Sequence, residues 1–275
     1  MPELPEVEVT RRSFASAIAG ACITDVQLGK PLRWPLGCAP QDLVGRRVRQ
    51  VRRRGKYLLL DLDRGMLMLH LGMSGSLRFA PQLPALGPHD HFDMHTSQGI
   101  LRLHDPRRFG AVLAVDDEDD PRAQKLLSGL GMEPLDAQSF RVEDFVRGLQ
   151  RHRSPIKSVL LAGKLVVGVG NIYACEVLFT CGIHPSTPAC ALSSAQALRL
   201  HAAIVDTLAQ AVQRGGTTLR DFSDAAGQSG HFQTETRVYG RQGQRCGVCA
   251  TPIQVLRQAQ RSTYFCPLCQ STARS

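Results

Sequence analysis

The spacing of hydrophobic residues changes along the chain, and each pattern predicts a different kind of structure. Val7, Phe14 and Ile18 recur at helical intervals after an acidic, proline-containing first turn. This predicts a first helix that Gly20 ends. Residues 23–115 then contain short apolar runs such as YLLLDL, MLMLHL and ILRLH, separated by the turn sequences DRG, GMSG and SQG. Short runs at this spacing predict a β-sandwich or barrel.

The second half of the chain follows a helical pattern. Residues 116–124 (DDEDDPRAQ) are acidic and rich in turn formers, and we expect a solvated loop there. Helices are predicted to begin near Ser154 and at Asn171, where asparagine is a favoured N-cap. A longer helix begins at residue 193 or 194 and has an apolar residue at every fourth position until Gly215. The fold class predicted from both halves is α+β.

Charge changes this picture by suggesting a partner. The formal net charge is +9, and 28 of the 33 basic residues are Arg. Seven basic residues and no acid occupy residues 46–56, and residues 236–275 contain six Arg and no acid. Such clusters are typical of a surface that contacts a phosphate backbone, although a single cluster is also compatible with a solvated face. No apolar run approaches the roughly 20 residues of a membrane span, and no signal peptide is visible, so we expect a cytoplasmic, nucleoid-associated protein.

Four of the nine cysteines have the spacing of a metal site. Cys246 and Cys249 form one C-x2-C pair, Cys266 and Cys269 form another, and sixteen residues separate the pairs. This spacing predicts a zinc ribbon with four thiolate ligands. Because protein would fill all four positions, the single Zn²⁺ is expected to be structural. The five other cysteines are expected to be reduced thiols.

The first residues offer a possible nucleophile. A small second residue such as Pro2 permits removal of the initiator Met, which would leave a free secondary amine. An α-amine has a pKa of about 8, so part of it is unprotonated at neutral pH. Such an amine can attack a sugar carbon and form an iminium ion, and the neighbouring Glu3 could protonate the sugar ring oxygen. An ordinary helix start is the alternative interpretation of these residues.

Several sequence motifs follow one another in an order that is specific enough to indicate a protein family. The segments MPELPEVE, RRGKYLLL, HLGMSGSLR, HDHFD, DPRRFG, KLVVGVGNIY, GGTTL, VYGR and CGVCATPI with AQRSTYFCPLC occur in sequence. Together they resemble the formamidopyrimidine-DNA glycosylases, which are bacterial base-excision repair enzymes. The resemblance implies an N-terminal β-sandwich with a leading helix, then a helix–two-turn–helix domain that ends in a zinc finger. It also implies excision of oxidised purines followed by strand cleavage through β- and δ-elimination.

The resemblance assigns four catalytic residues. Pro2 would be the nucleophile and Glu3 the general acid on the deoxyribose. Lys56 would hold a phosphate beside the lesion and assist β-elimination. Arg261, on the finger, would grip phosphates and assist δ-elimination. The expected product is a one-nucleotide gap with a phosphate at each end.

Further residues are expected to contact double-stranded DNA. An extruded base leaves a hole in the stack, and the resemblance implies that Met73, Arg107 and Phe109 fill it. It also implies that residues 217–233 cap the lesion. Additional DNA contacts are expected from four residues: His89, Arg153, Asn171 and Lys157. From sequence alone, His91 could be confused with His89.

The expected domains are a catalytic β-sandwich at 1–135, a linker at 136–150, the helical DNA-binding domain with the capping loop at 151–235 and the zinc finger at 236–270. We expect a monomer. Two alternatives remain open from the residues alone. An endonuclease VIII-like enzyme would prefer oxidised pyrimidines, and a non-catalytic zinc-ribbon protein would only bind DNA.

Overall fold

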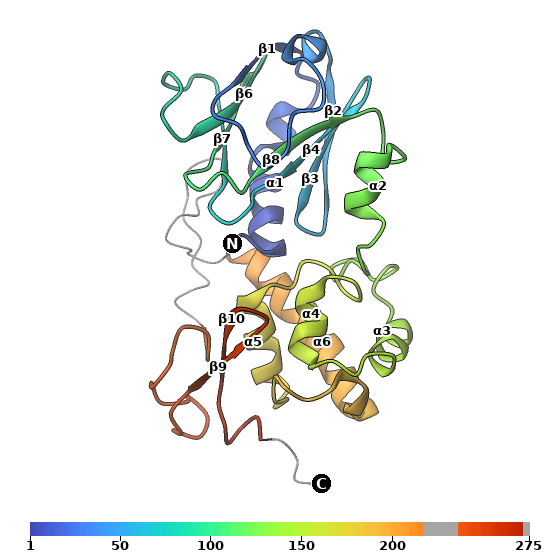
Figure 1. Cartoon of the computed structure of the whole chain (residues 1–275), viewed down its shortest axis with the longest axis vertical. Helices are drawn as coiled ribbons and strands as arrows, with labels where there is room; N and C mark the ends of the chain where they lie inside the picture. The colour runs from blue at the N-terminus through green and yellow to red at the C-terminus, as the bar shows by residue number, and fades with distance from the viewer. Residues whose placement is uncertain (217–235, 272–275) are drawn as a thin grey trace. The chain divides into compact units, whose positions relative to one another are not determined.

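The computed structural model describes residues 1–216 and 236–271, and the chain forms two compact units (Figure 1). Among the described residues, the first unit contains 1–129 and 214–216, and the second contains 130–213 and 236–271. The expected lesion-capping loop, residues 217–233, therefore lies outside the described part of the chain.

The first unit contains two antiparallel four-stranded sheets and a leading helix, as predicted. The elements of this unit are α1 (Leu4–Ile18), β1 (Ile23–Leu28), the 3₁₀ helix η1 (Pro40–Leu43), β2 (Val48–Arg54), β3 (Tyr57–Leu62), β4 (Met66–His70), β5 (Ser76–Ala80), β6 (Asp90–Thr96), β7 (Gly99–His104), β8 (Ala111–Val115) and α2 (Pro121–Leu127). The sheets have the strand orders β1-β6-β7-β5 and β2-β3-β4-β8.

One hydrophobic core joins the two sheets to α1. Val7, Phe14 and Ile18 are all buried, which confirms that they share one face of the helix. They pack with large apolar residues of both sheets, among them Leu60 of β3 and Phe92 of β6. The leading helix is thus fixed by side-chain burial along its length, and its first turn holds the start of the chain at one end of the core.

The prediction of a solvated acidic loop at residues 116–124 is partly wrong. Residues 116–120 form a bend, but Pro121–Leu127 form helix α2. Asp120 caps this helix by accepting a hydrogen bond from the N–H of Arg122 at 2.8 Å. Ala123 and Leu127 are buried. Proline in the first turn and an Asp cap are strong helix-start signals, which the acidic composition obscured.

The second unit consists of helices and one β-hairpin. Its elements are α3 (Val142–Gln150), α4 (Ile156–Ala162), α5 (Asn171–Thr180), the 3₁₀ helix η2 (Ala189–Ala191), α6 (Ser194–Gln213), β9 (Gln254–Gln258) and β10 (Arg261–Phe265). Helix α5 is almost completely enclosed, with residues 172–179 all buried. It packs against α4, α6 and β10, so the helical part and the finger share one support.

Two local expectations in this unit need correction. The segment expected to be a linker, 136–150, contains α3, because Phe145 and Leu149 are buried where that helix packs on α6. Asn171 is the first residue of α5 and not its N-cap, which is Gly170. The side chain of Asn171 makes contacts outside its own helix, described below. Among the described residues, no helix has the length and apolarity needed to cross a membrane.

Candidate functional site

Pro2 and Glu3 lie directly before the first turn of α1 and are both buried. The backbone N–H of Glu3 donates to Oε2 of Glu6 at 2.8 Å. On the other side of Glu6, Gly216 approaches so closely that a Cβ there would lie 3.2 Å from Oε1, and its φ is +80°. The turn containing Gly216 therefore needs glycine, and it packs against the helix turn that presents Pro2 and Glu3.

Lys56 lies in the turn between β2 and β3, and this turn is tied to α1. Gly55, just before it, has a φ of +57°. The guanidinium group of Arg53 donates to the carbonyl oxygen of Gly55 at 3.0 Å and to Oε2 of Glu8 at 3.1 Å. One arginine thus joins the helix that follows Glu3 to the backbone beside Lys56, which fixes the spacing between two predicted catalytic elements.

Glu8 is the acid at the centre of this connection. Its side chain is 8% exposed and forms ion pairs with Arg11, Arg12 and Arg53 at 2.7–3.1 Å. Burial by itself raises the pKa of Glu8, but the hydrogen bonds from Arg11 and Arg12 outweigh it and bring the pKa to about 2. The carboxylate is therefore charged throughout the physiological range.

Aromatic rings lie behind the Lys56 turn. Tyr57 packs against His70, with ring centroids 5.0 Å apart, and stacks on Trp34 at 6.4 Å. Burial, together with the charge of Lys56, lowers the pKa of His70 to about 4. Its Nδ1 accepts a hydrogen bond from the N–H of Gly72 at 3.0 Å. His70 is consequently neutral at pH 7 and orders the loop that follows β4.

The three predicted void-filling residues are exposed on two touching loops. Met73 and Phe109 are 43% and 42% exposed, so both apolar side chains are accessible to a partner. The guanidinium carbon of Arg107 lies 5.1 Å from the centroid of the Phe109 ring. A Cβ on Gly72 would lie 2.3 Å from the backbone of Phe109. The structure therefore brings all three residues to one place in the first unit.

The two histidines of the HDH motif are clearly distinguished. His89 is exposed, and its ring meets the ring of His104 edge to face at 5.9 Å. His91 is only 2% exposed. Of the pair, His89 is the one whose side chain is accessible to DNA.

A contact with a DNA phosphate would require Lys157 to lie on the surface, and it does not. Its side chain is fully buried. The ammonium group donates to Oδ1 of Asn171 and to Oγ1 of Thr263, both at 2.6 Å, and to the carbonyl oxygen of Ser262 at 3.4 Å. Nδ2 of Asn171 also donates to the Ser262 carbonyl at 2.9 Å. Lys157 therefore joins α4, the start of α5 and β10, and within the group Asn171 is half-buried and Ser262 is exposed.

Arg261 is exposed at the start of β10, directly after a tight hairpin turn. The two turn residues, Ala259 and Gln260, have φ values of +47° and +61°. Positive φ at both positions is typical of a type I′ turn, although glycine and asparagine are the usual residues there. Arg153 is also exposed, in the segment between α3 and α4.

The four predicted zinc ligands come together. The sulfur atoms of Cys246, Cys249, Cys266 and Cys269 all lie within 4.8 Å of one another. The Sγ–Sγ distances are 3.9 Å for Cys246–Cys269 and 3.4 Å for Cys249–Cys266. Tetrahedral Zn–S bonds of about 2.3 Å require sulfurs about 3.8 Å apart. The donor set and its spacing fit one structural Zn²⁺, as predicted.

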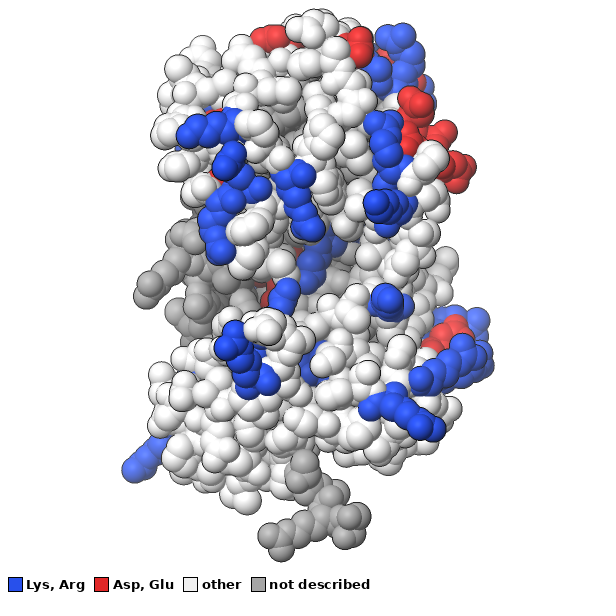
Figure 2. Space-filling model, in the orientation of Figure 1, with Lys and Arg blue, Asp and Glu red and all other residues white. Residues whose placement is uncertain are grey.

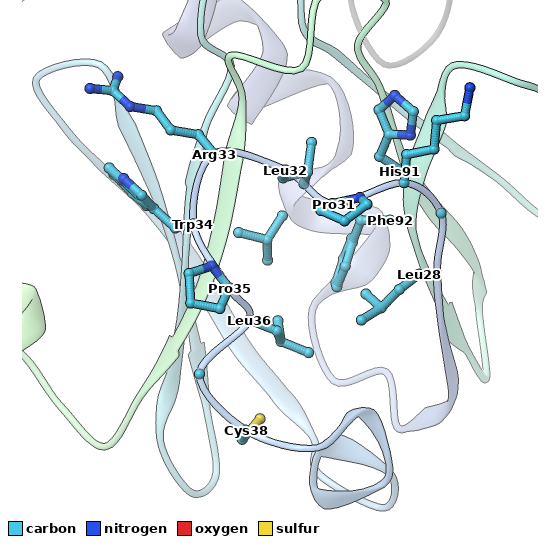
Figure 3. Close-up of a pocket in the computed structure, with 14 residues that line it drawn as sticks. Leu28, Pro31, Leu32, Arg33, Trp34, Pro35, Leu36, Cys38, His91 and Phe92 are labelled. Carbon is cyan, nitrogen blue, oxygen red and sulfur yellow. The ribbon is translucent and has the colours of Figure 1, made fainter.

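A separate cavity of about 760 Å³ lies under the loop that follows β1 (Figure 3). Leu32, Leu36 and Phe92 contribute to its apolar wall. Of the predicted site residues that the structure describes, none lines it.

On the face of the molecule in Figure 2, Lys and Arg side chains cover more of the surface than Asp and Glu, which agrees with the net charge.

Comparison with known proteins accounts for the combination of these features. The model of the formamidopyrimidine-DNA glycosylase N-terminal domain matches residues 1–112, that of the H2TH domain of the same enzymes matches 130–223, and a zinc finger found in FPG and IleRS matches 243–272. A formamidopyrimidine-DNA glycosylase of an Acidovorax species is 66% identical over 270 residues, which cover 98% of this chain and 99% of that protein. The chain belongs to the formamidopyrimidine-DNA glycosylase family.

Other family members support the same assignment. A formamidopyrimidine-DNA glycosylase of Variovorax paradoxus is 64% identical over 98% of this chain and 100% of that protein. The crystal structure of the MutM (Fpg) protein of Thermus thermophilus matches with a TM-score of 0.89 and 40% identity over 99% of this chain and 100% of that one. A Lactococcus lactis Fpg mutant in complex with Fapy-dG-containing DNA matches with a TM-score of 0.90 and 34% identity over 98% of this chain and 100% of that one.

Several buried acids in this family member were missed by the sequence analysis. Among them are Glu8, Asp105 and Glu176, each 6% exposed or less. Glu176 accepts hydrogen bonds at 2.8–3.1 Å from three successive N–H groups, those of residues 237–239, and burial raises its pKa. It therefore fastens the VYGR segment to α5. A lone acid in the apolar run ACEVLF was the available signal, because a buried carboxylate needs donors.

Proposed function

We propose that this chain is a bifunctional DNA glycosylase and AP lyase that removes oxidised purines, such as 8-oxoguanine and formamidopyrimidines, from double-stranded DNA. Membership of the family over the full chain length makes it a base-excision repair glycosylase, and this is the observation on which the proposal rests. The purine preference is supported by relatives whose solved complexes contain Fapy-dG or carbocyclic 8-oxo-G DNA.

The reaction starts at Pro2 after Met1 has been removed. The lone pair of the Pro2 nitrogen attacks the anomeric carbon of the extruded nucleoside, and the damaged base leaves with the electrons of the glycosidic bond. The nitrogen gives up its proton, which neutralises the departing base, and Glu3 protonates the ring oxygen as the sugar opens to the iminium ion. The position of both residues directly before α1 supports this assignment, because the first turn of this helix is buried and holds them in place.

The iminium ion then acts as an electron sink for two eliminations. Loss of a proton next to it expels the phosphate on the 3′ side, and a second elimination expels the phosphate on the 5′ side. We propose that Lys56 and Arg261 hold these phosphates and stabilise their charge as they leave. Both lie in tight turns with positive φ values next to them, which restrict the backbone that carries each cation. Hydrolysis of the iminium ion restores the amine.

DNA contacts outside the reaction come from both units. Met73, Arg107 and Phe109 fill the space that the base leaves, and His89 and Arg153 contact the backbone. Asn171 binds a phosphate at the start of α5, where free N–H groups favour an anion. Lys157 acts through Asn171 and the finger strand, because its ammonium group is buried against both. We expect a monomer.

The decisive test compares Pro2→Gly with Glu3→Gln on DNA duplexes. Glu3→Gln keeps the amine, so borohydride should still trap it on DNA that already contains an abasic site, while excision of 8-oxoguanine falls by about 10²-fold or more. Pro2→Gly should bind DNA nearly as well as the wild type but release the base slowly. A mature chain that retains Met1 and still cleaves at full rate contradicts the mechanism, and mass spectrometry of the intact protein shows which form is present.

The same preparation tests the two alternatives. A protein that only binds DNA gives no covalent adduct with borohydride. An endonuclease VIII-like enzyme excises thymine glycol faster than 8-oxoguanine, whereas we expect the reverse order. Analytical ultracentrifugation with and without a duplex tests the monomer.

A further inference from the structure

The carboxylate of Asp105 connects the two loops that carry the void-filling residues. Oδ1 accepts a hydrogen bond from the hydroxyl of Ser74 at 2.7 Å, and the N–H of Arg107 approaches the same oxygen at 3.3 Å. Oδ2 accepts the N–H of Gly110 at 2.6 Å. Ser74 follows Met73 in the first loop, and the other two donors belong to the second loop. One side chain thus bonds to both loops beside the residues that are expected to enter the DNA.

This connection is shielded from water. Asp105 is completely buried, and Ser74 is 6% exposed. Hydrogen bonds to a carboxylate are about twice as strong as those between neutral groups, and a buried carboxylate without donors is very costly. The backbone N–H of Asp105 also donates to the carbonyl oxygen of His89 at 2.8 Å. The segment with the exposed His89 is therefore fastened to the same point.

The backbones of the two loops also meet directly. Gly72 has a φ of +64°, and a Cβ there would lie 2.3–2.5 Å from the backbone of Phe109 and Gly110. In the second loop Arg108 has a φ of +54°, a conformation that is strained for a non-glycine residue. The Arg108 N–H donates to the carbonyl oxygen of Asp105 at 3.2 Å. A strained turn persists only where neighbouring bonds hold it, and Asp105 supplies several of these bonds.

We propose that Asp105, through Ser74, is a positioning residue that makes the two loops one rigid unit, so that Met73 enters the DNA together with Arg107 and Phe109. This inference rests on the proposed void-filling function. Its physical basis is preorganisation: side chains that are already held in the inserted geometry lose less conformational entropy when the base leaves the stack. Without the hydrogen bond between Ser74 and Asp105, each loop would have to be ordered separately while the base is extruded.

Ser74→Ala is the sharpest perturbation, because it removes only the bond between the loops. Asp105 keeps its donors from Arg107 and Gly110. Loss of one hydrogen bond to a charged group corresponds to a factor of about 13–160, and because the other two donors remain we expect single-turnover excision of 8-oxoguanine to slow about tenfold. Borohydride trapping on DNA with a preformed abasic site should change less than twofold, since that site has no base to extrude. Ser76→Ala is the matched control, because Ser76 is similarly buried, at 8% exposure, and is not among the donors to Asp105.

A double-mutant cycle provides a measurement that a merely structural role would not affect. If the loops insert as one unit, the losses of excision rate caused by Met73→Ala and Phe109→Ala should not multiply. The double variant should lose clearly less excision rate than the product of the two single losses. In the Ser74→Ala background the two losses should multiply. The inference is overturned if Ser74→Ala excises at the wild-type rate, if it impairs abasic-site trapping to the same extent, or if the two losses already multiply in the wild-type background.

The outcomes also separate this inference from the function on which it rests. If Met73→Ala and Phe109→Ala both excise 8-oxoguanine at the wild-type rate, the void-filling function itself is wrong. If both variants slow excision while Ser74→Ala does not, only the proposed role of Asp105 and Ser74 is wrong. Fluorescence of 2-aminopurine placed next to the lesion reports extrusion directly and should rise more slowly in Ser74→Ala than in Ser76→Ala.

Discussion

Replacement of Glu8 by Gln should destabilise the first unit in a pH-dependent way. The Glu8 side chain is 8% exposed and accepts hydrogen bonds from three arginines, one of which, Arg53, also holds the backbone beside Lys56. Gln keeps the size of the side chain but removes the negative charge. The variant therefore tests the charge with little change in packing.

The magnitude follows from the lowered pKa of Glu8. A change from 4.5 to about 2 corresponds to about 3 kcal/mol between the folded and unfolded states. Arg12 is 58% exposed and Arg11 is 27% exposed, so solvent weakens both ion pairs, and we expect about 2 kcal/mol at pH 7. Because the pKa is lower in the folded state, this stability is complete above pH 4.5 and is lost as the pH falls towards 2. At pH 3 about half of it should remain.

Urea unfolding followed by tryptophan fluorescence is the appropriate assay. Trp34 is the single tryptophan of the chain, and it stacks on Tyr57 in the first unit. Its emission therefore reports this unit even if acid releases zinc from the finger. Urea is preferred to guanidinium, since a salt would screen the ion pairs. Wild type and Glu8→Gln should be compared at pH 7, 5 and 3.

The expected result is a stability difference that is similar at pH 7 and 5 and about half as large at pH 3. A constant difference across all three pH values would refute the reasoning, because it would assign the effect to packing and not to charge. Arg12→Ala is the control for the exposed part of the network and should cost less than 1 kcal/mol.

Three further predictions concern other parts of the molecule. Lys157→Met should weaken DNA binding without changing its salt dependence, because the ammonium group is buried. Arg261→Ala should instead reduce the slope of log affinity against log salt concentration by about 1, because Arg261 is exposed. Equal slopes for the two variants would contradict these different placements. Chelation of zinc, or Cys249→Ser, should lower DNA affinity while the urea midpoint reported by Trp34 stays within error. Gly72→Ala should cost about 3 kcal/mol or more in the same urea assay, since its Cβ would overlap the backbone of Phe109, and a stable variant would show that the two loops can separate.

The sequence by itself determined the features that depend on neighbouring residues or on strict spacing. The helical period of Val7, Phe14 and Ile18 predicted the buried face of α1, and the spacing of the cysteine pairs predicted a four-sulfur cluster. Ordered motifs were sufficient to identify the family. These signals are readable because helix geometry and metal coordination each impose a fixed interval on the chain.

Only the tertiary structure decided which polar residues are buried and which partners they have. Lys157 and Arg261 are both basic residues in recognisable motifs, yet one is enclosed beneath Asn171 and the other is exposed on a hairpin turn. Asp105 lies 31 residues from Ser74, and no local pattern indicates that they bond. Burial is a property of how distant segments pack, so the sequence identifies a charged side chain without showing whether water or another part of the protein surrounds it.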